Sequence, residues 1–113
     1  MIDIEKINKT IILAEDYYKF FNSNTSYNFS ETKKEEAVTK LDNIISVLTN
    51  NFGETFHLNV KHLLEDRKEL NELKKEITMK YTLEAYKTVL GHTSGDLLSL
   101  ISNLEGYLKE KKI

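Results

Sequence analysis

The stretch IEKINKTIILAEDYYKFF, residues 4–21, decides the fold class. Its apolar side chains recur every three or four residues over about five turns, which is the spacing of one face of an α-helix. This face consists of Ile4, Ile7, Ile11, Ala14, Tyr18 and Phe21. Asp3 is the expected N-cap, because its carboxylate can accept a hydrogen bond from a backbone N–H of the first turn.

Two more helices are expected from the same spacing. One starts at Ser30 or Thr32 and stops near Gly53, because glycine tolerates the left-handed conformation that closes helices. Its apolar face consists of Ala37, Val38, Leu41, Ile44, Ile45 and Leu48, with Phe52 just past its end. The next helix begins near Glu54 or Thr55. Its core face consists of Phe56, Val60, Leu63, Leu64, Leu70, Leu73 and Ile77.

Beyond Ile77 the pattern leaves two alternatives. Apolar residues continue at helical spacing to Leu90, although residues 78–82 are rich in weaker helix formers. Either one helix runs from about Glu54 to Leu90, or the chain breaks or bends near Thr82. We favour the break, because one straight helix would extend several turns past its neighbours at about 1.5 Å per residue.

The segment from Gly91 to Asp96 predicts a further turn. Gly91 suits the end of one helix, and Thr93 with Asp96 three residues later suits the start of the next. The last helix then presents Leu97, Leu98, Leu100, Ile101, Leu104, Tyr107 and Leu108. The sequence therefore predicts an all-α fold, in which residues 1–113 form a single domain. The expected architecture is an antiparallel bundle of four to five helices.

Composition removes several classes of function. The chain has no Cys, which excludes a disulfide framework, a thiolate zinc site and a cysteine nucleophile. Its apolar runs are too short for a transmembrane span, and its start lacks the pattern of a signal peptide. We therefore expect a cytoplasmic protein. Abundant Lys, Asn, Ile and Glu with a single Arg indicate an AT-rich coding sequence, typical of a low-GC bacterium or its phages and plasmids.

No metal or cofactor site is predicted. His57 and His62 are five residues apart, whereas two zinc ligands on one helical face are usually four apart. Helical di-metal sites use two copies of a Glu-x-x-His motif, and this chain has one, from Glu54 to His57. The acidic stripe of Glu65, Glu69, Glu72 and Glu76 alternates with lysines and is interpreted as a solvated helix face.

No catalytic residue is predicted either, so we expect no enzymatic activity. His92, Thr93, Ser94 and Asp96 contain the residue types of a Ser-His-Asp site. Such sites are assembled from distant segments, however, and adjacent residues rarely reach the required geometry. Loop hydrogen bonds and helix capping explain these residues equally well. The four glycines form no phosphate-binding motif.

Aromatic residues gather at the end of the first helix. Only one member of each pair Tyr17-Tyr18 and Phe20-Phe21 can lie on the apolar face, which places Tyr17 and Phe20 on its flank. Tyr27 and Phe29 follow in the next loop. Exposed aromatic residues are typical of protein interfaces, so the predicted protein-binding residues are Tyr17, Phe20, Tyr27 and Phe29. Alternatively, the loop folds back and these residues complete the core.

The sequence thus favours a non-enzymatic protein-binding module that acts by stoichiometric contact. By analogy of size and composition only, it is of the immunity, anti-defence or accessory-subunit type. The expected partner is another protein, and a homodimer is compatible with the sequence. The alternative is a small nucleic-acid-associated subunit or regulator, with a helix-turn-helix between Gly91 and Leu108. The net charge of −2 and the single Arg67 make direct nucleic-acid binding the weaker hypothesis.

Overall fold

The structure is a computed structural model, which describes residues 3–23, 31–74 and 80–111. Its elements are α1 (Ile4–Ser23), α2 (Glu31–Phe52), α3 (His57–Lys74) and α4 (Lys80–Lys111). Within the described ranges nearly every residue is helical and no strand occurs. The predicted all-α bundle is confirmed, with four described helices.

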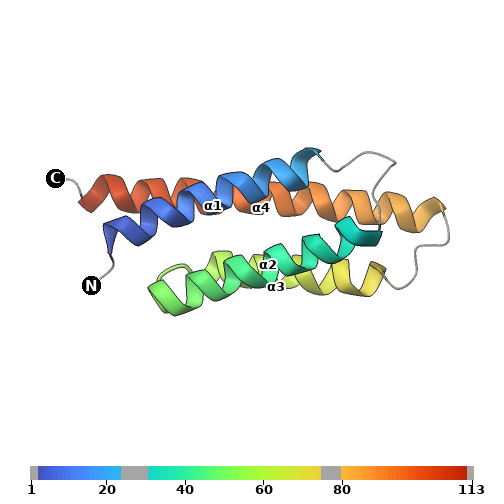
Figure 1. Ribbon diagram of the computed structural model, residues 1–113, viewed down its shortest axis with the longest axis horizontal. Helices are drawn as coiled ribbons and strands as arrows, with labels where there is room; N and C mark the ends of the chain where they lie inside the picture. Colours follow the sequence, from blue (N-terminus) through green and yellow to red (C-terminus); the bar gives the residue numbers. More distant parts are fainter. Residues whose placement is uncertain (1–2, 24–30, 75–79, 112–113) are drawn as a thin grey trace.

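The four helices form a closed ring of neighbours. α1 packs on α2, α2 on α3, α3 on α4 and α4 back on α1, and the α1–α4 interface is the most extensive. Figure 1 shows α1 and α4 lying side by side above α2 and α3, with both ends of the chain at the same end of the bundle. The molecule measures 52 × 21 × 19 Å. At about 1.5 Å per residue, the 32 residues of α4 nearly span that length.

The core lies along the bundle axis and draws on all four helices. Its largest fully buried side chains are Phe21, Ile7, Leu41, Ile44, Leu48, Leu63, Leu70, Leu90, Leu97, Leu100 and Leu104. Each contributes about 1.5–3 kcal/mol relative to an exposed side chain. The predicted apolar faces are confirmed at these positions. They are wrong at Ile4, Leu64 and Leu98, which are 40%, 47% and 48% exposed.

Gly53 closes α2 as the sequence predicts. Its φ of 58° is left-handed, and its N–H donates to the carbonyl of Thr49 at 3.2 Å. The chain then turns within a few residues, and Phe56 packs edge-on against Phe52 with ring centroids 5.4 Å apart. This tight turn places α3 antiparallel to α2, as Figure 1 shows.

The helical pattern beyond Ile77 belongs to a separate helix. α3 ends at Lys74 and α4 begins at Lys80, so a continuous helix to Leu90 is wrong. The break precedes Thr82, which lies in the first turn of α4. It allows α3 and α4 to pack against each other, which a single straight helix could not do.

The turn predicted from Gly91 to Asp96 is wrong, because α4 runs straight through it. The hydroxyl groups bond within the helix: Thr93 donates to the carbonyl of Val89 at 2.9 Å, and Ser94 to that of Gly91 at 2.8 Å. Thr93 itself is fully buried. Each internal glycine costs about 1 kcal/mol relative to alanine. Burial of the apolar residues on either side outweighs that cost. Because α4 has no turn here, the predicted helix-turn-helix is also wrong.

Candidate functional site

Polar residues line the contact between α3 and α4. Nδ2 of Asn103 donates a hydrogen bond to Oδ1 of Asn59 at 3.0 Å. One turn beyond that pair, Phe56 faces Tyr107 with ring centroids 6.1 Å apart. Two turns in the other direction, the Asp66 and Asp96 carboxyl groups share a hydrogen bond. These contacts follow one antiparallel register, so the polar groups form a row along the interface.

The Asp66–Asp96 carboxyl pair is the most unusual feature of this row. Asp66 is only 7% exposed, and its Oδ2 atom has no hydrogen-bond partner among the described residues. Burial raises the pKa of Asp66 to about 9, and the hydrogen bond and charge of Asp96 and the charges of Glu69 and Glu65 add to the effect. At neutral pH Asp66 is therefore protonated and donates to Asp96.

A hollow of about 210 Å³ lies beside this pair, between α3 and α4. We call it the α3–α4 hollow; it is lined by Leu58, Asn59, His62, Asp96, Ser99 and Asn103. Asp96 links the two features, because it lines the hollow and contacts Asp66. Leu58 is 60% exposed and is the apolar part of the lining. Small-molecule sites usually measure about 300–1,000 Å³, so this hollow suits a single side chain better than a cofactor.

Two chemical properties follow from this arrangement. The carboxyl pair holds a proton at neutral pH, chiefly because burial of Asp66 raises its pKa, to which the hydrogen bond and the charge of Asp96 add. It also lacks a cation: no ion pair joins Asp66 or Asp96 to a lysine or arginine within residues 3–23, 31–74 and 80–111.

Sequence reasoning missed Asp66, Asn59 and Asn103. A signal was present, because the inward positions of α3 follow a three- and four-residue spacing through Phe56, Asn59, Leu63, Asp66 and Leu70. Two members of that series are polar. A polar residue at a core position of a helical bundle is rare and typically fixes register or partner choice.

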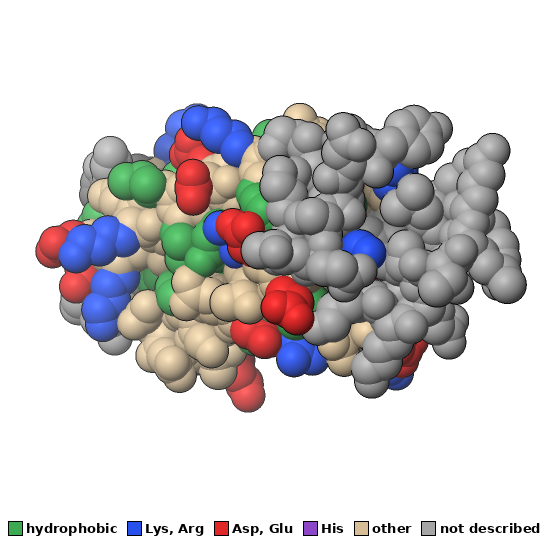
Figure 2. All heavy atoms as spheres, turned by 45° about the vertical axis from the view of Figure 1, so that its right-hand side comes forward, with side chains coloured by type: hydrophobic (Ala, Val, Ile, Leu, Met, Phe, Trp, Pro, Cys, Tyr) green, Lys and Arg blue, Asp and Glu red, His purple; other side chains and the backbone are tan. Residues whose placement is uncertain are grey.

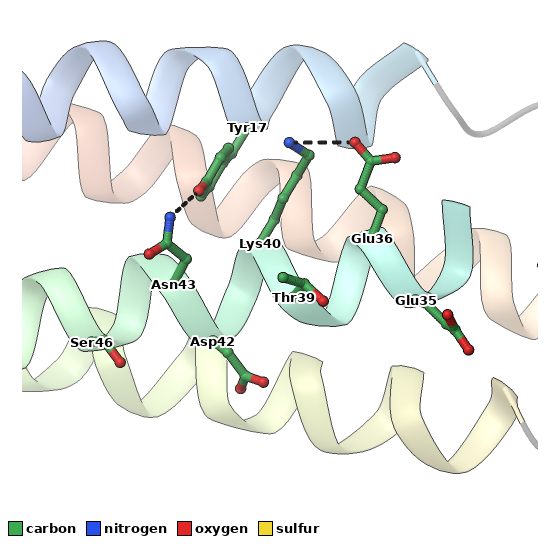
Figure 3. Close-up of a pocket in the computed structure, with 8 residues that line it drawn as sticks. All are labelled: Tyr17, Glu35, Glu36, Thr39, Lys40, Asp42, Asn43 and Ser46. Carbon is green, nitrogen blue, oxygen red and sulfur yellow. Dashed lines mark hydrogen bonds and ion pairs between the residues drawn. The ribbon is translucent and has the colours of Figure 1, made fainter. Parts of the chain in front are cut away.

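A second hollow, of about 690 Å³, lies over α1 and α2. Figure 3 shows Tyr17 reaching from α1 towards Asn43 of α2, and Lys40 extending between the helices. Nδ2 of Asn43 donates to the Tyr17 hydroxyl, and Nζ of Lys40 lies 3.6 Å from Glu36 and 4.7 Å from the centre of the Tyr17 ring. These polar groups bond to one another. None of them is therefore comparable to Oδ2 of Asp66, which has no partner among the described residues.

The predicted assignment of Tyr17 to the flank of α1 is wrong. Tyr17 is 6% exposed and belongs to the core, whereas Tyr18 is half-buried. Phe20 is also half-buried, packs edge-on against Phe21 and lies 5.1 Å from Nζ of Lys40. Tyr27 and Phe29 lie outside the described residues. Whether any of these residues contacts a protein stays a prediction.

The histidines are dispersed. His57, His62 and His92 are all exposed, on the first turns of α3 and midway along α4. Nδ1 of His57 lies 3.2 Å from the carbonyl of Glu54. No cluster of His, Asp or Glu in the described part of the chain has the geometry to hold a metal ion. The structure brings Asp96 to Asp66, and it does not assemble His92, Ser94 and Asp96 into a site, because Ser94 bonds its own helix.

The surface carries both signs of charge. In the part of the face that Figure 2 shows in colour, acidic and basic side chains are intermixed, and apolar side chains reach the surface between them. Ile12 is the most exposed of the large apolar residues, at 69%. None of the helices in the described ranges carries an apolar stretch long enough to cross a bilayer.

Comparison with known proteins identifies no relative. No protein-family model, no curated protein and no solved structure matches this chain. The geometry of the α3–α4 interface is therefore the basis for any functional proposal.

Proposed function

We propose that this chain is a non-enzymatic protein-binding module that acts by stoichiometric contact through its α3–α4 face. The observation that supports this most directly is the buried Asp66 carboxyl, whose Oδ2 atom lacks a partner among the described residues. A buried acceptor left unsatisfied costs about 1–3 kcal/mol. Asp66 contacts Asp96, which lines the α3–α4 hollow, so this cost falls on the face that carries the hollow.

The surroundings of the carboxyl pair fit a protein partner. Leu58, at 60% exposure, offers apolar contact area at the edge of the α3–α4 hollow. Ser99 and Asn103 offer hydrogen-bonding groups on the α4 side. An apolar contact next to convergent polar groups is typical of a protein interface. The hollow is too small for a typical cofactor, whereas it can receive one side chain of a larger molecule.

This proposal relocates the interface predicted from the sequence. Tyr17 is a core residue, and replacing it would lower stability. A loss of binding in such a variant could not be attributed to a lost contact with the partner. Phe20 is half-buried beneath Lys40 and offers only part of its ring. The α3–α4 face, in contrast, combines an exposed leucine with one buried carboxyl oxygen that has no hydrogen-bond partner among the described residues.

Photo-crosslinking at position 58 tests the proposal. A benzophenone amino acid would replace Leu58, and in a matched control it would replace Lys9, which is exposed and lines a hollow between α1 and α2. We expect position 58, and not position 9, to yield one crosslinked protein in the native host. The purified complex should have a fixed stoichiometry in native mass spectrometry, and Leu58→Ser should weaken it.

Two results would count against this function. Equal crosslinking at positions 58 and 9 would show that the α3–α4 face is not a specific interface. A crosslink to nucleic acid, with binding that falls steeply as salt rises, would support the nucleic-acid alternative instead.

A further inference from the structure

We propose that the outer face of α4 binds a second copy of this chain, so that two α4 helices pack antiparallel about a two-fold axis. This inference goes beyond the proposed function, because it concerns a different side of α4. The residues of the outer face are all exposed: Gly91, Gly95, Leu98, Ser102, Gly106 and Lys109. The fully buried leucines of α4 lie on the opposite side of the helix: Leu90, Leu97 and Leu104.

The outer face of α4 has the spacing of a contact between helices. Its residues follow one another at intervals of three and four positions, so they form one line along about five turns of α4. α4 meets α3 along another line, through Asp96, Asn103 and Tyr107, and it packs on α1 as well. The outer face therefore repeats, on the solvent side of α4, the periodicity by which helices pack on one another.

Three glycines leave the outer face open to a close neighbour. A Cβ atom built at Gly91, Gly95 or Gly106 meets nothing within 4 Å, so no contact inside the described part of the chain requires glycine there. Each of these glycines costs the helix about 1 kcal/mol relative to alanine. Glycine does, however, allow another backbone to approach closely. A second helix can therefore lie nearer to this side of α4 than to an ordinary helix surface.

Leu98 supplies an apolar side chain on the same line. It is 48% exposed and follows Gly95 by about one turn. In an antiparallel pair that sets Leu98 opposite Gly95 of the second copy, two-fold symmetry also sets Gly95 opposite Leu98 of the second copy. Each leucine then fills the space above a glycine, and Gly91 lies opposite Ser102 of the second copy. A face that fits itself in this way identifies a second copy as the occupant.

Charge selects the same arrangement. One turn beyond the pairing of Gly91 with Ser102, it brings Lys87 within one residue of Glu105 of the second copy. Lys87 and Glu105 are five turns apart and lie on the same flank of α4. Antiparallel packing about a two-fold axis brings equal flanks of the two helices together. Opposite charges therefore meet at both ends of the contact, and the two copies are complementary in charge as well as in shape.

Sedimentation velocity of the purified protein tests the dimer. The parent should pass from monomer to dimer between about 1 µM and about 1 mM, the range of a small transient interface. Leu98→Ser and Gly95→Gln should each raise the dissociation constant by about tenfold or more. Leu64→Ser is the matched control, because Leu64 of α3 is 47% exposed, and it should dimerise like the parent. Circular dichroism should show parental helical content in every variant.

A charge exchange tests the antiparallel arrangement without touching the centre of the contact. Glu105→Lys places like charges together at both ends and should raise the dissociation constant by about three- to tenfold. Adding Lys87→Glu to that variant restores opposite charges and should recover the dimer. Glu72→Lys makes the same change of charge at an exposed position of α3 and should have little effect.

Three results would overturn the inference: a parent that stays monomeric throughout this range, a dimer retained by both Leu98→Ser and Gly95→Gln, or a double charge variant that does not recover. None of them bears on the proposed function, which is read from the crosslink at position 58 to a different protein. A Leu98→Ser variant that is monomeric and still crosslinks at position 58 would support both.

Discussion

Tyr17 of α1 is held by Asn43 of α2, whose Nδ2 atom donates a hydrogen bond to the tyrosine hydroxyl. The ring of Tyr17 also lies beneath the ammonium group of Lys40, with Nζ 4.7 Å from its centre. Both contacts cross from one helix to the next (Figure 3). Tyr17 therefore joins α1 to α2 as a core residue, which agrees for this residue with the core alternative that the sequence left open.

Replacing Tyr17 should lower stability in two distinct steps. Tyr17→Phe removes only the hydroxyl and should reduce the free energy of unfolding by about 0.5–1.5 kcal/mol. Tyr17→Ser also empties the ring site and should reduce it by about 3–5 kcal/mol, in the manner of other aromatic truncations. Urea unfolding followed by circular dichroism measures both. A Tyr17→Ser variant that unfolds like the parent would show that the ring is not part of the core.

Leu63 and Leu64 form a matched pair on α3. Leu63 is fully buried, whereas Leu64 is 47% exposed. Leu63→Ala should destabilise the protein by about 2–5 kcal/mol, and Leu64→Ala should cost clearly less because water already reaches that side chain. Chemical denaturation of the two variants decides the orientation of α3. Similar losses from both would mean that the helix is rotated relative to this description.

Alanine at Gly91 or Gly95 should stabilise the protein. Both glycines lie inside α4, and a Cβ atom built there meets nothing within 4 Å. Each substitution should raise the free energy of unfolding by about 0.5–1 kcal/mol, because glycine loses more backbone freedom on folding. Gly53→Ala is the control and should destabilise, since the φ of 58° at Gly53 disfavours a side chain. If the Gly91→Ala and Gly95→Ala variants are instead less stable than the parent, the result would support the turn that the sequence predicts there.

Stability should depend on pH through Asp66. Burial raises the pKa of Asp66 from its ordinary value of 3.8 to about 9 in the folded protein, so between these values the folded state binds more protons than the unfolded state. The stabilising contribution is complete below 3.8 and is lost as pH rises towards 9. The slope can reach about 1.4 kcal/mol per pH unit. Thermal melts of the parent across this range measure the decline.

Asp66→Asn is the control for that pH dependence. The amide cannot ionise in this range and can donate a hydrogen bond to Asp96. The free energy of unfolding of the variant should therefore increase steadily relative to that of the parent as pH rises. Parallel melting curves for the two proteins across the same range would contradict the raised pKa of Asp66.

Periodicity alone predicted most of the fold, because burial of an apolar face outweighs local propensity. The faces through Ile7, Ile11 and Phe21 in α1, and through Leu41 and Leu48 in α2, are buried as expected. The same principle explains the error at residues 91–96. Glycine and threonine favour turns locally, yet Thr93 continues the buried face between Leu90 and Leu97.

The candidate site was harder to predict, since its residues have no motif. Asp66 resembles any surface acid in an alternating charged helix, and only its place between Leu63 and Leu70 marks it as inward-facing. Its partner Asp96 lies on another helix, and their contact depends on the register of α3 against α4. The choice between Tyr17 and Tyr18 failed for a similar reason: the two lie about 100° apart on α1, and the packing of α1 against its neighbours decides which of them faces inward.

The extensive contact between α1 and α4 also determines when the chain can complete its fold. These helices are the most distant in sequence among the four, so their pairing must close nearly the whole chain into a loop. As the protein is synthesised, α1 emerges from the ribosome long before α4 exists to cover it. The apolar face of α1 through Ile7, Ile11 and Phe21 can pack on α4 only after residues 80–111 have been made. Until then this apolar face lacks its most extensive partner, so partly synthesised chains are prone to aggregate through α1.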